Sequence, residues 1–145
     1  MLITLARALV VLAIASSAAA YGQCVKTLAP CPDSPNCVAT NDANPERRFP
    51  LLTIKQSDAA AWKHVRDAIS QFERVEILEE QAGYLHATVT SLIFRFVDDL
   101  EVTLCDNGRS LALRSASRTG HWDVGVNRER VEEFVDRLRA SDTVR

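Results

Sequence analysis

The positions of the prolines constrain the fold of this chain more than any other feature. All five prolines lie between Pro30 and Pro50. Proline fixes φ and lacks a backbone donor, so neither a helix nor a central strand is expected there. The segment Asp33-Ser34-Pro35-Asn36 has strong turn chemistry. We therefore predict an irregular, disulfide-held arm over residues 21–50, a compact body over 51–140 and a short tail over 141–145.

The body has the hydrophobic spacing of alternating strands and two amphipathic helices. The first helix is expected over 59–72, with Ser57 or Asp58 as its cap and an apolar stripe of Ala61, Val65, Ala68, Ile69 and Phe72. We expect Asn127 to cap the last helix, whose stripe is Val131, Phe134, Val135 and Leu138. Strands are predicted over 51–54, 74–80, 84–91, 94–105 and 110–118, and Asn107-Gly108 signals a hairpin between the last two.

This order, β-α-β-β-β-β-α, predicts the fold class. Consecutive strands joined by short turns favour antiparallel pairing. Two amphipathic helices that cover one face of a sheet make a two-layer domain. We expect an α+β fold with a mostly antiparallel sheet of about five strands.

The first twenty residues have the features of a secretory signal peptide. Arg7 precedes a short apolar run, and small residues end at Ala20. Cleavage there would leave a mature chain beginning at Tyr21, without a stable membrane span, in the periplasm or outside the cell. The alternatives are an uncleaved N-terminal anchor and a lipid attached to Cys24.

Export determines how the four cysteines are interpreted. An even number in an exported chain indicates disulfides, and four cysteines allow three pairings. We prefer Cys31 with Cys37, which enclose a short loop, and therefore Cys24 with Cys105. Zinc bound by these thiols with His86 or His121 is the alternative, but five residues separate Cys31 from Cys37, more than zinc sites usually have. We predict no metal and no cofactor.

Charge and aromatic content argue against nucleic-acid binding. Lys+Arg number 17 against 19 for Asp+Glu, and there are only 2 Tyr, 2 Trp and 5 Phe. Nucleic-acid binders carry basic patches and stacking rings.

One predicted strand has a charge where its alternation requires an apolar residue. Asp98 interrupts the even-numbered positions of the 94–105 strand. Either a bulge near Asp98-Asp99 exchanges the faces, or Asp98 is buried and needs a partner. Arg114 and Arg118 share one face of the return strand, so they are the expected cations for Asp98, Asp99 or Glu101.

The polar residues around this hairpin form the candidate ligand site. The simpler interpretation is a cross-strand ladder of salt bridges on the solvated face. The alternative is that Arg114, Arg118 and Arg128 receive a polar or anionic group. The remaining candidates for the same site are His86, Asp98, Asp99, Ser115, Ser117, Asp123 and Asn127. The pattern favours a non-catalytic module that binds a small polar or anionic ligand or an envelope protein.

The alternative is a hydrolase or transferase that uses the same polar cleft. It would draw on Ser115 or Ser117 with His86 or His121. The chain has no G-x-S-x-G nucleophile elbow, and a triad requires geometry that composition does not supply.

Several separated motifs carry a resemblance to a known family. They are Cys31-Pro-Asp-Ser-Pro-Asn-Cys37-Val, Tyr84-Leu-His-Ala87, Phe96-Val-Asp-Asp-Leu-Glu101, Arg114-Ser-Ala-Ser-Arg118-Thr-Gly120 and Asp123-Val-Gly125-Val-Asn127-Arg128-Glu-Arg130-Val131-Glu132. From about Cys31 to Leu138 the chain resembles the bacterial family catalogued as domain of unknown function 1499. The resemblance implies an envelope-directed or organellar protein and no assigned activity. Ala39-Thr40 stand where the family usually has two serines.

Overall fold

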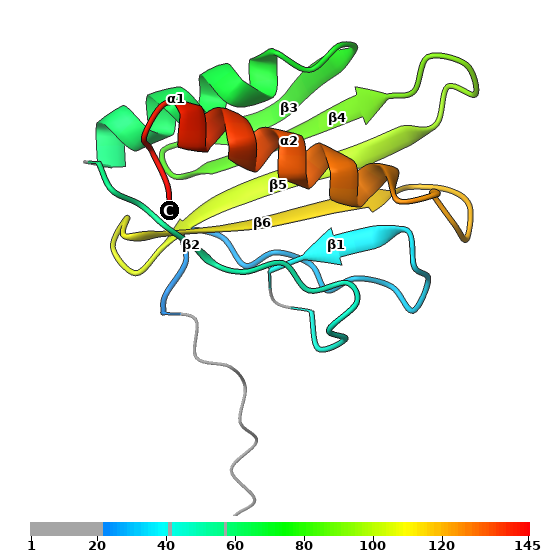
Figure 1. Cartoon of the computed structure of the whole chain (residues 1–145), viewed down its shortest axis with the longest axis horizontal. Coiled ribbons are helices and arrows are strands. Elements are labelled where there is room, and N and C mark those ends of the chain that lie inside the picture. The colour runs from blue at the N-terminus through cyan, green and yellow to red at the C-terminus, as the bar shows by residue number, and fades with distance from the viewer. Residues whose placement is uncertain (1–21, 41, 57) are drawn as a thin grey trace, which may run out of the picture.

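The computed structural model describes residues 22–40, 42–56 and 58–145. The predicted signal peptide and the predicted cap at Ser57 lie outside the described residues. The elements in chain order are β1 Cys37–Ala39, β2 Leu52–Thr53, α1 Asp58–Ser70, β3 Val75–Gln81, β4 Tyr84–Thr90, β5 Val97–Cys105, β6 Ser110–Ser117 and α2 Val126–Ala140 (Figure 1).

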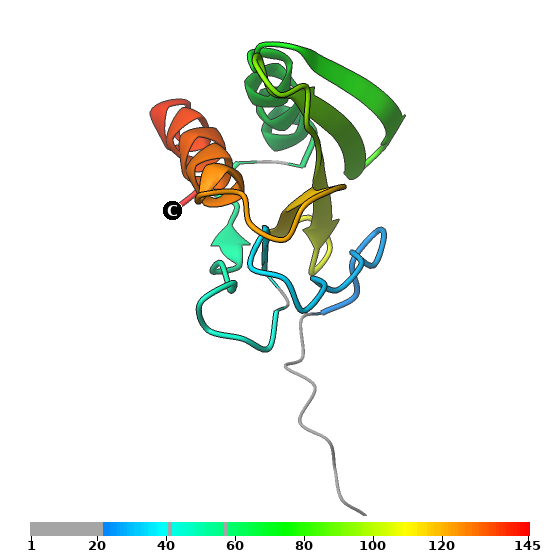
Figure 2. The ribbon, with the colours of Figure 1, turned by 90° about the vertical axis from the view of Figure 1, so that its right-hand side faces the viewer.

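A single antiparallel sheet carries the fold. Its strands run in the order β1-β6-β5-β4-β3, and β2 pairs with β6 beside this path. Both helices lie on one face of the sheet (Figure 2). The predicted two-layer α+β class is therefore confirmed. No helix in the described part of the chain is both long and apolar enough to cross a membrane.

The main core lies between the sheet and the helices. Both predicted helical stripes are buried there, because residues three or four apart share one helix face. Leu85, Ala87 and Val89 of β4 also face this core, since alternate residues of a strand point the same way. We call this side of the sheet the helix face.

The opposite side, which we call the arm face, is covered at one end by the proline-rich arm. Leu28 packs there with Tyr84, Cys105 and Ala112 in a second, smaller cluster. The Val25 amide donates to the carbonyl of Leu104 at 2.9 Å. The arm thus runs along the end of β5.

Two disulfides hold the arm in place. Cys24 is joined to Cys105, and Cys31 to Cys37. The preferred pairing is confirmed, and none of the four cysteines is free. The zinc alternative loses the thiols that it requires.

The arm also contributes a strand that the sequence analysis did not predict. β1 pairs with β6 at the edge of the sheet. Its three residues lie between Pro35 and Pro45, and an edge strand needs partners on one side only. The expected tail, residues 141–145, also pairs with the chain near β2 through its last residues: Val144 bridges to Ile54, and the Arg145 amide donates to the carbonyl of Thr53.

The predicted strand over 94–105 begins three residues later, at Val97. Arg95 has a φ of 55°, which is incompatible with an extended strand. The Phe96 amide donates to the Ser91 hydroxyl, and the Ser91 amide donates to the carbonyl of Phe96. Residues 91–96 are therefore a closed loop, and Phe94 and Phe96 belong to it.

The cap of α2 also differs from the expectation. Asn127 is already inside the helix, which begins at Val126. The carboxylate of Asp123 accepts hydrogen bonds from the amides of Gly125 and Asn127. Gly125 has a φ of 87°, a conformation that glycine adopts without strain, and this brings the Asp123 side chain back to the helix start.

Candidate functional site

Strand alternation divides the predicted site residues between the two faces of the sheet. Asp98, Ser115 and Ser117 lie on the helix face, where Asp123 and Asn127 meet them. The arm face holds His86, Asp99, Arg114 and Arg118. Arg128 lies apart from both groups and donates to the carbonyl of Glu46.

On the helix face, Asp98 is buried and paired, which was one of the two expected outcomes. Its Oδ2 lies 2.6 Å from Nη2 of Arg130, and both side chains are less than a tenth exposed. The pairing of β5 with its neighbours runs through Asp98 without a shift, so there is no bulge. The predicted partners Arg114 and Arg118 are wrong for this carboxylate, because they lie on the other face.

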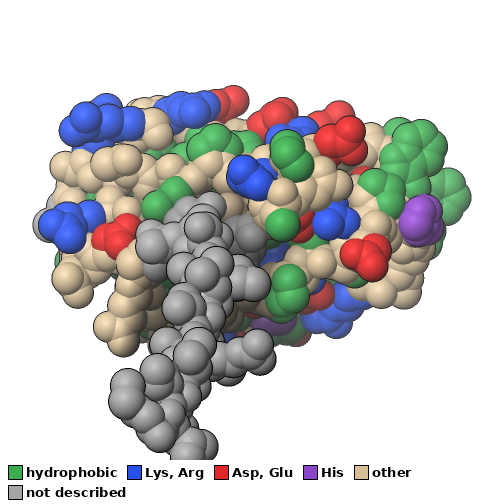
Figure 3. Space-filling model, turned by 90° about the horizontal axis from the view of Figure 1, so that it is seen from below, with side chains coloured by type: hydrophobic (Ala, Val, Ile, Leu, Met, Phe, Trp, Pro, Cys, Tyr) green, Lys and Arg blue, Asp and Glu red, His purple; other side chains and the backbone are tan. Residues whose placement is uncertain are grey.

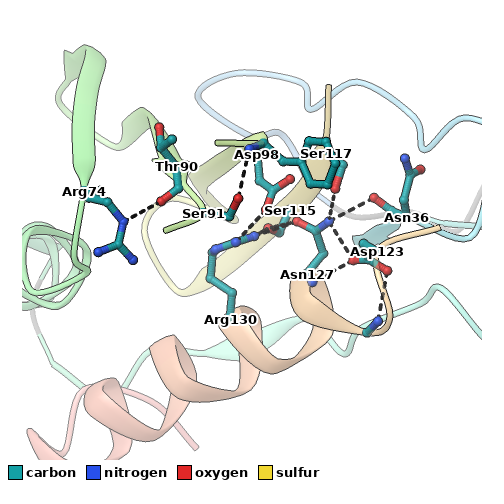
Figure 4. A network of polar contacts seen from close by, with 12 residues as sticks. Asn36, Arg74, Thr90, Ser91, Asp98, Ser115, Ser117, Asp123, Asn127 and Arg130 are labelled. Carbon is teal, nitrogen blue, oxygen red and sulfur yellow. Dashed lines mark hydrogen bonds and ion pairs between the residues drawn. The ribbon is translucent and has the colours of Figure 1, made fainter. Parts of the chain in front are cut away.

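Arg130 also connects the pair to a wider network (Figure 4). Its Nη1 donates to Oδ1 of Asn127 at 2.7 Å and to the Ser115 hydroxyl at 3.1 Å. The Asn127 side-chain amide lies within bonding distance of the Ser117 hydroxyl, the Asp123 carboxylate and the carbonyl of Asn36. The network therefore joins the arm, β5, β6 and α2 beneath the start of the helix.

One atom of this network has no partner. Oδ1 of Asp98 is buried and makes no hydrogen bond to any described residue. A buried polar atom without a partner costs about 1–3 kcal/mol. Such an atom is a candidate contact for a ligand.

Asp98 lines a cavity of about 300 Å³ at this end of the molecule. We call this cavity the tip pocket. Two loops enclose it, residues 91–96 between β4 and β5 and residues 118–125 between β6 and α2, and we call them the tip loops. They project together at the right-hand end of Figure 1. The pocket is lined by Ser91, Phe94, Phe96, Asp98, Ser117, Thr119, Gly120, Trp122, Asp123, Val124 and Val126.

The wall of the tip pocket is mainly apolar and unusually exposed. Phe94 is 73% exposed and Trp122 is 71% exposed. The rings of Phe94 and Phe96 stack with their centroids 5.6 Å apart. Large apolar side chains that gather on a surface mark interaction sites.

The arm face carries two chains of polar contacts across β4, β5 and β6. In the first, Asp99 lies 2.7 Å from Nε2 of His86 and 2.9 Å from Nη2 of Arg118. In the second, Glu101 accepts from the Tyr84 hydroxyl at 2.9 Å and from Nη1 of Arg114 at 3.0 Å. The expectation that Arg114 and Arg118 pair with Glu101 and Asp99 is confirmed.

These contacts shift the acidity of two arm-face groups in opposite directions. Partial burial acts to raise the pKa of Asp99, but the hydrogen bonds from Arg118 and His86 outweigh it and hold that pKa below its ordinary value. Burial, followed by the hydrogen bond to Glu101, raises the pKa of Tyr84 well above its ordinary value. Asp99 is therefore held as a carboxylate between Arg118 and His86.

The three arginines of the expected anion site do not converge. Arg114 and Arg118 are each bound to a carboxylate on the arm face, and Arg128 projects from α2 toward the arm. The serines considered as hydrolase nucleophiles are not paired with the histidine considered as their base. Ser115 and Ser117 bond to Asn127, whereas His86 bonds to Asp99. No cluster of three potential metal ligands occurs within residues 22–40, 42–56 and 58–145.

Arg130 and the apolar wall of the tip pocket were not among the predicted site residues. Arg130 lies one residue before Val131 and four before Phe134, on the buried stripe of α2. A charged residue at that helical position was the signal that a buried partner exists. The aromatic wall gave no comparable signal, because Phe94 and Phe96 fit the alternation of a strand.

The comparisons with known proteins place the chain in a family without indicating an activity. No curated protein matches it. The family model described as protein of unknown function (DUF1499) matches residues 27–138, which is most of the chain and includes the whole span of the resemblance, Cys31 to Leu138. The protein therefore belongs to the DUF1499 family.

Proposed function

We propose that this protein is an exported, non-catalytic binding domain whose ligand occupies the tip pocket. The ligand that fits this pocket is a small molecule with an apolar body and a hydrogen-bond donor. One observation carries the proposal: a buried carboxylate oxygen without a partner, Oδ1 of Asp98, belongs to a residue in a wall of exposed aromatic side chains.

The size and chemistry of the wall support the apolar part of the ligand. A volume of about 300 Å³ is at the lower end of the range for small-molecule sites. Such sites combine an apolar lining with a few polar groups that orient the ligand. Phe94, Phe96 and Trp122 supply the lining, and Asp98 supplies the orienting group.

The charges around Asp98 support a neutral donor. Arg130 already balances the Asp98 carboxylate, so a hydroxyl or an amide N–H suffices to satisfy Oδ1. Asp123 is a second carboxylate in the wall. An anion would meet both acids, so we favour the polar ligand of the sequence analysis over the anionic one.

Export is supported by the cysteines and by the N-terminal sequence. Two disulfides fit an oxidising compartment such as the periplasm or the cell exterior. Residues 1–20 have the pattern of a secretory signal peptide. A binding role is favoured over the hydrolase or transferase alternative because the candidate serines are held by Asn127 and not by a histidine.

Three matched aromatic probes test the ligand class on the full chain. We expect 2-naphthol to shift the amide NMR signals of residues 91–98 and 117–126. 2-Methoxynaphthalene lacks the O–H, leaves Oδ1 of Asp98 unsatisfied and should bind about ten-fold more weakly. 2-Naphthoate, which carries a negative charge, should bind more weakly than 2-naphthol.

Two variants locate the binding. Trp122→Ala should weaken the binding of both neutral probes by the same factor, because it removes part of the apolar wall. Leu78→Ala, at an exposed apolar position on β3 outside the pocket, should change neither. Equal affinity for 2-naphthol and its methyl ether would contradict the role of Asp98, and tightest binding of 2-naphthoate would restore the anionic ligand.

A further inference from the structure

The tip loops present more apolar surface than the pocket uses. Leu92 is 67% exposed and Ile93 is 79% exposed, and neither lines the tip pocket. Most of the large apolar side chains that are exposed in the described part of the chain belong to this end: Leu92, Ile93, Phe94, Phe96, Trp122, Val124 and Val126. In the view from below, hydrophobic side chains gather at this same end (Figure 3).

The conformation of the first tip loop is already formed. Two hydrogen bonds between Ser91 and Phe96 close the loop. Arg95, in the left-handed region, separates Phe94 from Phe96, and their rings stack. A partner that binds this loop therefore does not have to order it first.

The first tip loop carries a positive charge, although the chain as a whole has a net charge of -2. The exposed Arg95 is the charged residue of the first loop, which has no acidic residue. In the second loop Arg118 is paired with Asp99, and the exposed His121 is neutral in the formal charge count. Its acidic residue, Asp123, is half-buried and accepts hydrogen bonds from the start of α2.

We propose that the tip loops dock on the anionic surface of a phospholipid membrane. Exposed aromatic and aliphatic side chains combined with arginine are typical of segments that enter the boundary between headgroups and acyl chains. Trp122 and Ile93 lie in that boundary, and Arg95 meets lipid phosphate. Leu92 and Ile93 carry this inference independently of the ligand in the tip pocket.

Trp122 provides a direct readout of docking. The chain has two tryptophans, and Trp62→Phe leaves Trp122 as the only one. With vesicles of phosphatidylcholine and phosphatidylglycerol in equal amounts, we expect a blue shift of Trp122 emission and quenching by brominated acyl chains. The matching Trp122→Phe protein, which keeps Trp62 on α1, should show neither response.

Substitutions on the tip loops separate the apolar contribution to vesicle binding from the electrostatic one. Ile93→Ser should weaken partitioning about ten-fold, because one large apolar side chain no longer enters the lipid. Arg95→Gln should weaken it about five-fold on the anionic vesicles and leave binding to pure phosphatidylcholine unchanged. Leu78→Ser, at a position 47% exposed on β3, is the matched control and should have no effect.

The tryptophan readout is needed because the apolar segment over residues 1–20 could hold the full chain on vesicles by itself. Unshifted Trp122 emission on vesicle-bound protein would overturn the proposal. An equal vesicle-dependent shift of Trp122 emission in the Ile93→Ser and Leu78→Ser proteins would do the same. If the protein shows no response to vesicles but forms a dimer in solution that Ile93→Ser dissociates, then the tip loops bind a second copy of the chain and not a membrane. Ile93→Ser should leave 2-naphthol binding intact, so failure here is distinguishable from failure of the proposed ligand.

Discussion

Asp98 and Asp99 are neighbours in the chain, and alternation along β5 sends their side chains to opposite faces of the sheet. Asp98 is buried against Arg130 on α2. Asp99 is partly exposed between His86 and Arg118 on the arm face. Asp98 is therefore in a dry environment with one partner, whereas Asp99 is in a more hydrated environment with two partners.

The environment of Asp99 predicts a specific response to acid. Its pKa in the folded protein is below the ordinary value of about 3.9. A carboxyl whose pKa is lowered on folding stabilises the protein above its unfolded pKa, and that stability is lost as the pH falls through the folded pKa. Because Arg118 is 45% exposed, the contribution is at most about 1 kcal/mol.

We expect Arg118→Gln to raise the titration midpoint of the Asp99 carboxyl, followed by NMR, because burial remains while the guanidinium group is removed. Arg109→Gln, an equivalent change at an exposed arginine in the turn between β5 and β6, should leave the midpoint where it is. An unchanged midpoint in the Arg118 variant would show that Arg118 does not govern this carboxyl.

At the scale of the elements, the first half of α2 is held to the sheet by polar contacts and its second half by apolar packing. Val131, Phe134, Val135 and Leu138 are fully buried against the sheet. Asn127 and Arg130, on the same side of the helix, meet the polar network instead. This change along one helix stripe places a buried charge beside the tip pocket.

The buried pair predicts a pronounced asymmetry between single and double variants. Arg130→Met leaves the Asp98 carboxylate buried and unpaired, which should lower the free energy of unfolding by about 3–5 kcal/mol. Asp98→Leu combined with Arg130→Met removes both charges, and most of the loss should be recovered. Urea unfolding at neutral pH measures both.

Arg139→Met, at an exposed arginine of the same helix paired with Asp136, is the control and should cost less than about 1 kcal/mol. A double variant no more stable than Arg130→Met alone would mean that the network, and not the unpaired charge, determines the loss.

At the scale of the whole molecule, the arm is part of the sheet and not an appendage. It contributes β1 to one edge and covers part of the arm face. Asn36, in the arm, also takes part in the network under α2, since its carbonyl accepts from Asn127. The proline-rich arm therefore makes contacts on both the arm face and the helix face of the sheet.

The two disulfides should contribute unequally to stability. The Cys24–Cys105 bridge joins residues 81 positions apart, and Cys31–Cys37 joins residues 6 apart. On the chain-entropy model, the long loop is worth about 4.5 kcal/mol and the short one about 2 kcal/mol. We expect Cys24→Ala with Cys105→Ala to lose about twice the unfolding free energy lost by Cys31→Ala with Cys37→Ala.

Denaturant unfolding of oxidised protein measures both losses, after mass spectrometry has verified the remaining bridge and the absence of free thiols. Equal losses would mean that the long bridge mainly adds strain to the folded state, or that the unfolded chain keeps the arm near β5.

Local patterns were sufficient to predict the main elements of the body and the fold class, but not the edge strand β1 in the arm. Side-chain direction repeats every two residues in a strand and every 3.6 in a helix, so Leu85, Ala87 and Val89 could be assigned to the core from their spacing alone. The turn at Asn107-Gly108 and the Cys31–Cys37 bridge are also local. The assignment of Cys24 to Cys105 then followed by elimination.

Tertiary structure alone decided which distant groups meet. Asp98 and Arg130 are 32 positions apart, and the partner of this carboxylate depends on where α2 crosses the sheet. The two tip loops become neighbours only because β4 and β6 end, and β5 begins, at the same end of the sheet. Periodicity specifies the direction of a side chain along its own element and contains no information on where separate elements cross. The sequence by itself therefore determined the two-layer domain, whereas only the folded chain determined the tip pocket and its unpaired oxygen.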